Sequence, residues 1–361
     1  MKKDWTYKKL GEIAEIVMGQ SPSGESINEN VGVEFHQGKV FFGEKYLEYS
    51  NSKTDSPTKI AEAHSLLLCV RAPVGIVNIT ERKICIGRGL CAIRGREATT
   101  DYLYHVLKSK LTYFETNSTG STFKAISSSV VKDTTIPVPP ISIQESIVRE
   151  LDAIHGILEK KQEQLRELDN LAQAIFYEMF GDPITNPKQW EVKKLGEVCE
   201  ELFAGGDVPK DDFSEEENEI QNIPIYSNGI KNEGLYGYTS KPRVFNPAVT
   251  ISGRGTIGAS FIRTTPFLPV IRLIVAVPNK MVNIIYFAES IKLLNFEGNG
   301  NSIPQLTIPK VKEYSIPLPP LSLQQSFAAK IEAIEAQKQA VQQSIREVEA
   351  LLAERMDNYF S

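Results

Sequence analysis

IPVPPISIQES at residues 136–146 returns as IPLPPLSLQQS at residues 316–326, with seven of the eleven positions identical. The motif that opens the chain is repeated too, since Trp5-x-x-Lys-Lys-Leu-Gly-Glu returns from Trp190. The shift is 185 residues for the opening motif and 180 for the proline-rich motif, so the second copy is five residues shorter. A repeat of this kind predicts two similar structural units. Between these motifs the copies differ widely, which indicates a shared frame with different contents.

The proline-rich motif predicts an extended segment that leaves each unit, because proline continues neither a helix nor a central strand. Ser142-x-x-Glu145 and Ser322-x-x-Gln325 then predict capping boxes that begin helices. The residues that follow keep a heptad spacing for more than four heptads, and Gly181 with Pro183 predicts the end of the first helix. We expect two helices of roughly 54 Å, from ~36 residues at ~1.5 Å each.

The two helices are expected to pair as an antiparallel coiled coil along one apolar seam. The alternative is a pair of ordinary amphipathic helices, each buried against its own domain. The seam includes Leu151, Ile154, Leu158, Leu165, Leu168, Ile331, Ile334, Val341, Ile345 and Val348.

The expected fold class is α+β: two mixed α/β domains separated by the two long helices, in a pseudo-two-fold internal repeat. The domains cover residues 1–140 and 184–320, and the helices cover 141–183 and 321–361. Helical stripes are expected around residues 104–114 and 284–294. Strands are expected at residues 65–70, 84–86 and 248–252, from short apolar runs bounded by turn residues.

Composition is that of an ordinary globular protein, with 41% hydrophobic residues and a mean hydropathy of −0.21. The N-terminus is followed by no apolar signal core, so a cytoplasmic location is expected. The four cysteines show no CxxC spacing, which disfavours a zinc site or a disulfide framework. The net charge of −5 divides into +3, −5, −1 and −2 over residues 1–140, 141–183, 184–320 and 321–361. Acid is concentrated on the predicted helices, so nonspecific attraction of this chain to phosphate should be weak.

Three motifs suggest chemistry that their context does not favour. The GRGTIG of residues 253–258 matches a dinucleotide-binding loop, but a strand rather than a helix is expected after it, so it is interpreted as a turn. Asp182 with Glu191-x-Lys193 imitates a nuclease spacing, yet the first copy has Thr6 in place of the glutamate. The acidic run at residues 215–219 is interpreted as a solvated loop. The sequence contains no Asn-Pro-Pro-Tyr or Asp-Pro-Pro-Tyr motif, which an amino-methyltransferase would use to hold a flipped base.

Four motifs of the chain, taken together, resemble those of the specificity subunits of Type I restriction–modification enzymes. The resemblance is carried by Trp-x₄-Leu-Gly-Glu, the GQSPS of residues 19–23, the SGRGTIG of 252–258 and the Ile-Pro-x-Pro-Pro-x₃-Gln exit into a long helix. It covers essentially the whole chain. The second copy departs from it at residues 205–209, which match GQSPS poorly.

The resemblance implies that each globular unit is a target-recognition domain for double-stranded DNA. It implies that the paired helices bind two methyltransferase subunits, which makes the seam residues candidates for partner binding, and that nuclease–translocase subunits can join. S-adenosylmethionine, ATP and Mg²⁺ would be used by those partners. The chain itself is expected to carry no catalytic residue, metal or cofactor.

Each domain is expected to recognise a few base pairs, most readily in the major groove, where all four base-pair orientations differ. The target should be bipartite and asymmetric, with half-site centres about 34–36 Å apart. Arginine suits guanine, asparagine and glutamine suit adenine, and lysine and tyrosine more often contact phosphate. The candidate residues are Arg71, Arg88, Arg94 and Lys124 in the first copy, and Lys231, Tyr236, Tyr238, Arg243, Arg254, Asn301 and Gln305 in the second.

Two hypotheses from other classes compete with this one. The chain could be a self-contained DNA-modifying enzyme, which would turn over substrate without a partner. It could instead be a protein-binding scaffold, which would bind partners through its helices and show no DNA sequence preference.

Overall fold

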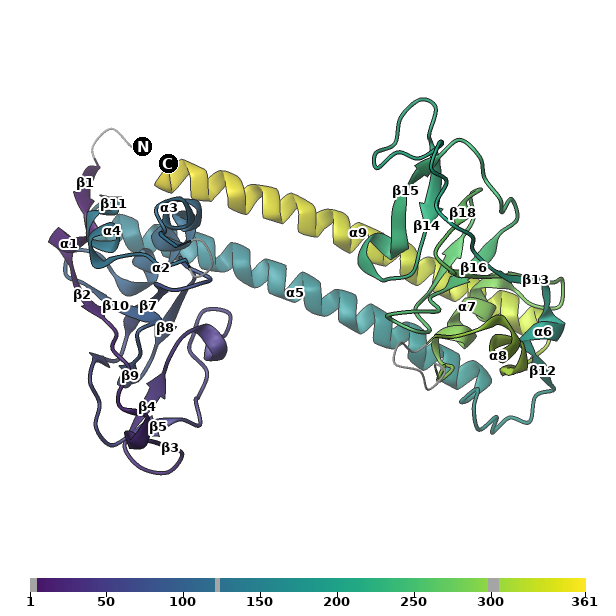
Figure 1. Cartoon of the computed structure of the whole chain (residues 1–361), viewed down its shortest axis with the longest axis horizontal. Coiled ribbons are helices and arrows are strands. Elements are labelled where there is room, and N and C mark those ends of the chain that lie inside the picture. Colours follow the sequence, from purple (N-terminus) through teal and green to yellow (C-terminus); the bar gives the residue numbers. More distant parts are fainter. Residues whose placement is uncertain (1–4, 121–123, 298–304) are drawn as a thin grey trace. The chain divides into compact units, whose positions relative to one another are not determined.

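The computed structural model describes residues 5–120, 124–297 and 305–361, and the chain forms two compact units. Unit 1 comprises Met1–Gln162 and Gln343–Ser361, and unit 2 comprises Glu163–Gln342. The two long helices are α5 (Ile141–Phe180) and α9 (Leu321–Phe360) (Figure 1). One part of each helix belongs to unit 1 and the other part to unit 2. The long helices are therefore parts of the two units, because their apolar faces complete the units' cores.

Unit 1 is built on a four-stranded antiparallel sheet of order β2-β10-β7-β8. Its strands are Ala14–Met18 (β2), Leu90–Gly95 (β10), Ser65–Cys69 (β7) and Val77–Thr80 (β8). Helices α2 (Thr100–Ser109) and α3 (Leu111–Thr116) pack beside it, so the predicted stripe at residues 104–114 is divided between two helices. All of β10 is buried except its C-terminal end at Arg94 and Gly95, as its apolar run requires.

A second, five-stranded sheet in unit 1 has the order β3-β5-β4-β9-β6, and β4 and β9 are parallel. Its strands are Ile27–Asn28 (β3), Lys53–Thr54 (β5), Val33–His36 (β4), Ile84–Ile86 (β9) and Ile60–Ala61 (β6). Short 3₁₀ turns lie at Gly24–Ser26 (η2) and Lys39–Phe41 (η3).

Unit 2 repeats this plan with a four-stranded sheet of order β13-β19-β16-β17 and a smaller sheet of order β15-β14-β18. The first sheet contains Cys199–Ala204 (β13), Ile274–Pro278 (β19), Ala248–Ile251 (β16) and Ser260–Arg263 (β17). The second contains Leu235–Thr239 (β15), Ile223–Tyr226 (β14) and Leu268–Pro269 (β18), and β14 and β18 are parallel. Helix α7 (Ile284–Lys292) takes the place of α2. The predicted internal repeat of mixed helix and sheet is confirmed.

The repeated sequence motifs form the same frame in both units. The opening motifs supply β1 (Thr6–Lys9) and β12 (Val192–Lys194), which pair antiparallel with the exit strands β11 (Thr135–Val138) and β20 (Ser315–Pro317). Short helices complete the frame: α1 (Leu10–Ile13) and α4 (Ser128–Asp133) in unit 1, α6 (Leu195–Val198) and α8 (Ile308–Glu313) in unit 2. Each exit strand lies in a two-stranded sheet, so it is an edge strand and its prolines remove no hydrogen bond from a central strand.

Each long helix begins earlier than the predicted capping boxes require. The backbone N–H groups of Ile143 and Gln144 donate to Pro140 O at 2.9 and 3.1 Å, so Ser142 lies inside the first turn rather than at the N-cap. The side chain of Gln144 is fully buried instead, and its Nε2 donates to Pro139 O at 2.9 Å and Glu97 O at 3.0 Å.

The same clamp occurs in unit 2, where Gln324 Nε2 donates to Pro319 O at 2.8 Å and to Met281 O at 3.2 Å. In each unit the amide oxygen also accepts the backbone N–H before the helix that packs on the sheet: Thr99 at 3.0 Å and Asn283 at 2.8 Å. One glutamine in each unit therefore joins the exit segment to the α/β domain.

The predicted seam is buried or half-buried along both long helices, while the positions around it are mostly exposed. Figure 1 shows α5 and α9 antiparallel within each unit. In unit 1 Tyr359 Oη donates to Glu150 Oε2 at 2.6 Å, and in unit 2 Lys338 Nζ lies 2.8 Å from Asp169 Oδ1. The seam residues face the core of their own unit and the other long helix. That the two helices supercoil around each other stays a prediction.

Candidate nucleic-acid interface

Three turns meet at one end of the four-stranded sheet of unit 1. Antiparallel order places the end of β7 beside the start of β10, and Val70 N–H donates to Gly89 O at 2.9 Å. Two further bonds join the segment before α4: Ile126 N–H to Val70 O at 3.0 Å and Ala72 N–H to Lys124 O at 2.9 Å. These bonds gather three of the predicted residues, Arg71, Arg88 and Lys124, all exposed.

The corresponding end of the sheet in unit 2 is held by equivalent bonds. Leu306 N–H donates to Gly253 O at 2.8 Å, in the place of the bond from Ile126. Arg254 follows at the exposed tip of this turn, and its Nη2 donates to Gln305 Oε1 at 2.8 Å. Two predicted residues are thereby brought into contact.

A loop between β14 and β15 joins the same end of the sheet. Asn228 Oδ1 accepts the Gly253 N–H at 2.8 Å, and Gly229 N–H donates to Ser252 Oγ at 3.1 Å. The loop continues into a 3₁₀ turn, η4 (Lys231–Gly234), which carries the exposed Lys231.

We call these surfaces the strand-end faces of unit 1 (Arg71, Arg88, Lys124) and unit 2 (Lys231, Arg254, Arg272, Gln305). Arg272 was not predicted from the sequence. It lies three residues after the end of β18 and is exposed, and the parallel pairing of β14 with β18 places the two strand ends together. The signal that could have found it is its position immediately before the apolar run of β19.

The loop at Gly205 keeps one backbone contact of the GQSPS loop. Although residues 205–209 match GQSPS poorly in sequence, Gly205 N–H donates to Leu273 O at 2.7 Å just as Gly19 N–H donates to Leu90 O at 2.9 Å. A Cβ on either glycine would lie within 2.6 Å of backbone atoms of the neighbouring strand end. The backbone contact is preserved because it needs only glycine, and the rest of the motif is free to vary.

The remaining predicted residues lie elsewhere. Arg94 is near the far end of β10, where it is paired with Glu15 across the sheet. Tyr236 and Tyr238 lie on β15, and Arg243 lies 4.4 Å from the ring centroid of Phe203. Asn301 is outside the described residues.

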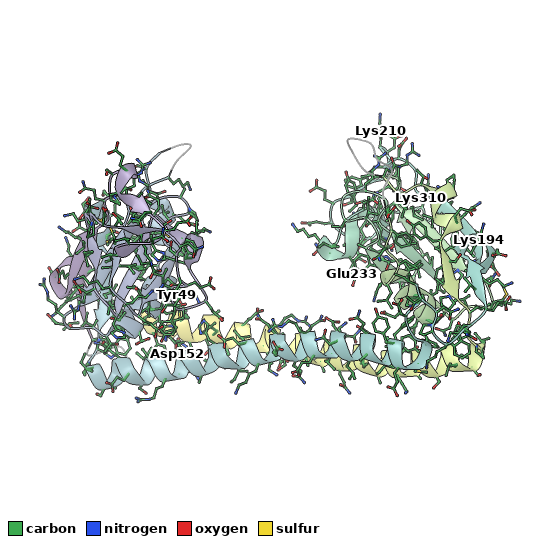
Figure 2. The ribbon with its side chains drawn as sticks, turned by 90° about the horizontal axis from the view of Figure 1, so that it is seen from below. Tyr49, Asp152, Lys194, Lys210, Glu233 and Lys310 are labelled. Carbon is green, nitrogen blue, oxygen red and sulfur yellow. The ribbon has the colours of Figure 1, made fainter. Side chains whose placement is uncertain are left out.

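Two other arginines are held in structural networks. Arg82 donates to both carboxylate oxygens of Glu34 at 2.6 and 2.7 Å, and its guanidinium lies 3.8 Å from the ring centroid of Tyr49. Figure 2 labels Tyr49 in unit 1. Burial alone would raise the pKa of Glu34, but the hydrogen bonds from Arg82, Ser50 and His36 lower that pKa to about 2. In unit 2, Arg263 is 5% exposed, lies 3.6 Å from the ring of Tyr226 and donates to Thr250. These guanidinium groups stabilise loops and are not free to contact a ligand.

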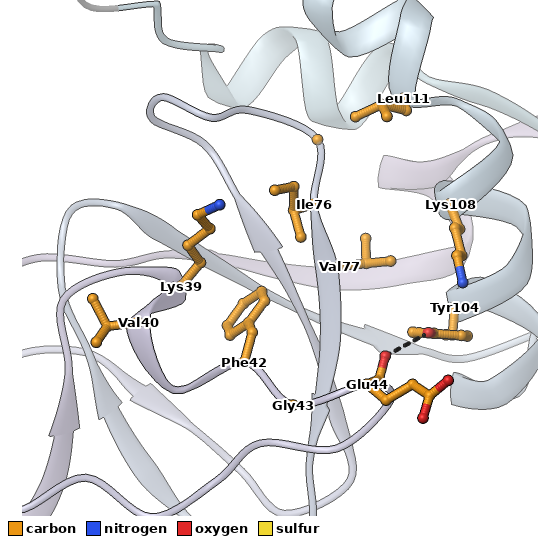
Figure 3. Close-up of a pocket in the computed structure, with 11 residues that line it drawn as sticks. Lys39, Val40, Phe42, Gly43, Glu44, Ile76, Val77, Tyr104, Lys108 and Leu111 are labelled. Carbon is orange, nitrogen blue, oxygen red and sulfur yellow. Dashed lines mark hydrogen bonds between the residues drawn. The ribbon is translucent and has the colours of Figure 1, made fainter. Parts of the chain in front are cut away.

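Unit 1 also contains an open cavity of about 550 Å³ between η3, β8 and α2 (Figure 3). Phe42, Ile76 and Val77 form much of its lining, Lys39 and Lys108 contribute charge, and Tyr104 Oη donates to Glu44 O at 3.0 Å. Burial lowers the pKa of Lys108. The cavity combines an apolar lining with two cations.

A neighbouring cavity shares Tyr104 and reaches α5. There His105 Nε2 lies 2.8 Å from Asp152 Oδ1, and Lys45 Nζ lies 2.7 Å from Asp152 Oδ2 (Figure 2). Burial lowers the pKa of His105 to about 4, against the opposing effect of Asp152.

The competing motifs take the forms expected of them. The GRGTIG segment is the turn between the antiparallel strands β16 and β17, and the acidic run at residues 215–219 is exposed. Glu191 forms an ion pair with Lys193 at 2.7 Å, while Asp182 accepts the backbone N–H of Ile184. All four cysteines are free, and the described part of the chain holds no cluster of three potential metal ligands. Of the helices described, none combines the length and apolar character that a membrane span requires.

Comparison with known proteins gives matches over nearly the whole chain. The family model for the Type I restriction modification DNA specificity domain matches twice, at residues 2–168 and 187–350. A putative type I specificity subunit of Mycoplasma pneumoniae, S.MpnORF507P, is 27% identical over 91% of this chain and 88% of its own. The putative type I restriction enzyme MjaX specificity subunit of Methanocaldococcus jannaschii is 36% identical over 48% of this chain and 42% of its own.

Solved structures show the same fold. The S subunit of a Type I restriction-modification system from M. genitalium superposes with a TM-score of 0.62 at 17% identity, over 99% of this chain and 96% of that one. A chain from a study of complex assembly and conformational transition of the type I R-M system superposes with a TM-score of 0.64 at 19% identity, over 98% and 97%.

Proposed function

Because this chain belongs to the family of Type I restriction–modification specificity subunits, we propose that it recognises an asymmetric, bipartite DNA target through its two strand-end faces. The observation that carries the proposal is the contrast within each unit. Equivalent backbone hydrogen bonds hold turns at the same sheet end in both units, while the exposed side chains on those turns differ between the units.

Unit 1 offers two guanidinium groups and a lysine on its strand-end face, which suits guanine recognition with a phosphate contact. Unit 2 offers Arg254 beside Gln305, a pair that combines a guanine partner with an adenine partner. The Arg254–Gln305 hydrogen bond orients both side chains before DNA is bound, which lowers the entropy cost of binding. The two half-sites therefore differ in sequence.

We further propose that two methyltransferase subunits bind the long helices and that nuclease–translocase subunits join the assembly. The seam residues are covered by the chain itself, so the exposed positions of α5 and α9 are the surface left for these partners. The chain is non-catalytic in this proposal. S-adenosylmethionine, ATP and Mg²⁺ act in the partner subunits, and the assembly works in the cytoplasm, where its DNA is.

Domain replacement tests the division of labour. Residues 10–135 are exchanged for those of another family member, and the methylation sites of the assembled complex are mapped. One half of the target should change and the other half should stay as it was. A change in both halves, or in neither, would contradict the proposal.

Assay of the chain alone tests the absence of catalysis. The purified chain is incubated with DNA, Mg²⁺ and S-adenosylmethionine, and methylation and cleavage are measured. We expect neither product until the methyltransferase partner is added, whereas turnover by the chain alone would identify an enzyme.

A further inference from the structure

The turn that precedes β19 in unit 2 is the counterpart of the turn that precedes β10 in unit 1. Each is closed by one backbone hydrogen bond of 3.0 Å, from Leu90 N–H to Gly87 O and from Leu273 N–H to Val270 O. The central residues are 88–89 in unit 1 and 271–272 in unit 2. Both turns carry an arginine, but the arginine stands one position later in unit 2.

The two turns also differ in backbone conformation. Ile271 and Arg272 have φ angles of +52° and +61°, in the left-handed region, whereas neither Arg88 nor Gly89 has a positive φ. Turns with positive φ at both central residues favour asparagine and glycine, and a β-branched residue there is a genuine outlier. Strain of this kind persists only where neighbouring groups hold it, and it collects at functional sites.

Two hydrogen bonds hold the strained turn at Ile271, and a third fixes Asn228, which makes one of them. Asn228 Nδ2 donates to Ile271 O at 2.6 Å, and Asn228 Oδ1 accepts the N–H of Gly253, next to Arg254. Ile271 N–H donates to Gly206 O at 2.8 Å. Asn228 therefore ties the turn of Arg272 to the turn of Arg254.

The strain leaves two adjacent side chains presented outward. Ile271 is 38% exposed, and Arg272 is exposed with no hydrogen bond or ion pair to its side chain from any described residue. A bare guanidinium beside an exposed aliphatic group matches the major-groove edge of a guanine next to a thymine methyl. Because the backbone is fixed by side-chain and backbone bonds, the pair is directed rather than mobile.

We propose that Arg272 determines specificity in unit 2 by donating two hydrogen bonds to O6 and N7 of one guanine. Ile271 contacts the methyl group of a neighbouring thymine, and Asn228 is a positioning residue that keeps the left-handed turn. This inference rests on the proposed function, since it identifies which group of the strand-end face contacts a base.

The test uses the complex with its methyltransferase partner and a DNA library randomised over the target. The variant I271N/R272G keeps a turn that favours positive φ but removes both side chains, and Arg272→Lys keeps the charge without the two-pronged geometry. Lys280→Ala is the matched control, since Lys280 is an exposed cation beyond the other end of β19. Methylated sites are sequenced for each variant.

We expect both Arg272 variants to lose discrimination for guanine at one position of one half-site by about 10-fold, within roughly 5- to 150-fold for a two-bond contact. The other half-site and the Lys280→Ala complex should keep wild-type preferences. Unchanged preference in Arg272→Lys would overturn the inference, as would an equal loss at all sequences, because either result identifies a phosphate contact or no contact. A wild-type complex without any sequence preference would instead contradict the proposed function.

Discussion

Unit 1 and unit 2 share their buried polar contacts and differ in their exposed ones. Tyr102 Oη donates to Pro137 O at 3.0 Å in unit 1, and Tyr286 Oη donates to Pro317 O at 2.7 Å in unit 2. The glutamine clamp is equally repeated. At the strand-end faces, by contrast, the turn that carries Arg88 in unit 1 corresponds to the turn of Ile271 and Arg272 in unit 2. The φ angles of Ile271 and Arg272 are positive, whereas that of Arg88 is not. The shared frame therefore depends on hydrogen bonds to backbone atoms, so the exposed side chains on it can differ between the units.

The clamp should produce the largest effect when it is broken. Gln144→Ala and Gln324→Ala each leave buried backbone groups without partners, so each should lower the free energy of unfolding by about 3–5 kcal/mol. Denaturant titration with hydrogen exchange would measure the loss and assign it to a unit. Gln164→Ala, at an exposed position of α5, is the control. Losses that differ greatly between the two variants would break the equivalence of the frames.

His105 should make unit 1 more sensitive to acid than unit 2, where the equivalent residue is Glu289. His105 lies three residues after Tyr102 on α2, as Glu289 does after Tyr286 on α7. The pKa of His105 is lowered to about 4 in the folded chain, so between pH 6.5 and about 4 the unfolded chain binds a proton that the folded chain does not. The free energy of unfolding should fall through that window by roughly 3 kcal/mol.

The groups that face His105 are Asp152, Lys45 and His155. His105→Ile should flatten the decline in stability below pH 6.5, measured by denaturant titration at several pH values. Part of the decline should remain, because burial lowers the pKa of His36 in the same unit. An unchanged pH profile in His105→Ile would show that this histidine does not titrate as described.

Arginines at the matched turns should affect separate halves of the target. Arg71→Ala and Arg254→Ala should each cost about 1–3 kcal/mol of base discrimination, in opposite half-sites. Binding and methylation of single-base variants of the target would measure this. Lys124→Ala and Lys231→Ala are the contrasting variants, since loss of a phosphate contact weakens all sequences alike and lowers the salt slope by about 1. An effect of one arginine on both halves would contradict independent recognition.

The smallest effect on the free energy of unfolding is expected at Lys338, which lies on α9 in unit 2. Lys338 is paired with Asp169 and Glu335, both largely exposed, and such pairs contribute about 0–1 kcal/mol. Lys338→Met should therefore change the free energy of unfolding by less than about 1 kcal/mol, with Asp169→Asn as its comparison. A loss well above that value would show that the lysine is needed to align the helices.

Much of the frame could be predicted because the residues that form it are repeated in the sequence. The proline-rich motif, the heptad spacing and Gly181 define the exit strands and long helices, and the structure places the seam residues on the covered face. The predicted capping boxes were wrong because serine after Pro-Pro looks like an N-cap, while Pro140 O accepts the first helical hydrogen bond.

The strand-end faces could be predicted only in part. Arg71 and Arg254 stand at matching turns whose glycines are visible in the sequence, so both could be chosen as candidates, and their contact with bases stays a prediction. Arg272 was missed, because its exposure depends on positive φ angles that an Ile-Arg pair does not suggest. Arg94, predicted together with Arg88, lies near the other end of β10 and so is not part of the strand-end face, and its contact with DNA stays a prediction.

In the proposed function, two similar frames recognise two different half-sites. Sequencing of the methylome of a host that expresses this chain with its methyltransferase partner tests it most directly. We expect one asymmetric motif of two specified halves around an unspecified spacer, with one methylated base in each half on opposite strands. A continuous motif, two identical halves or the absence of any motif would contradict it.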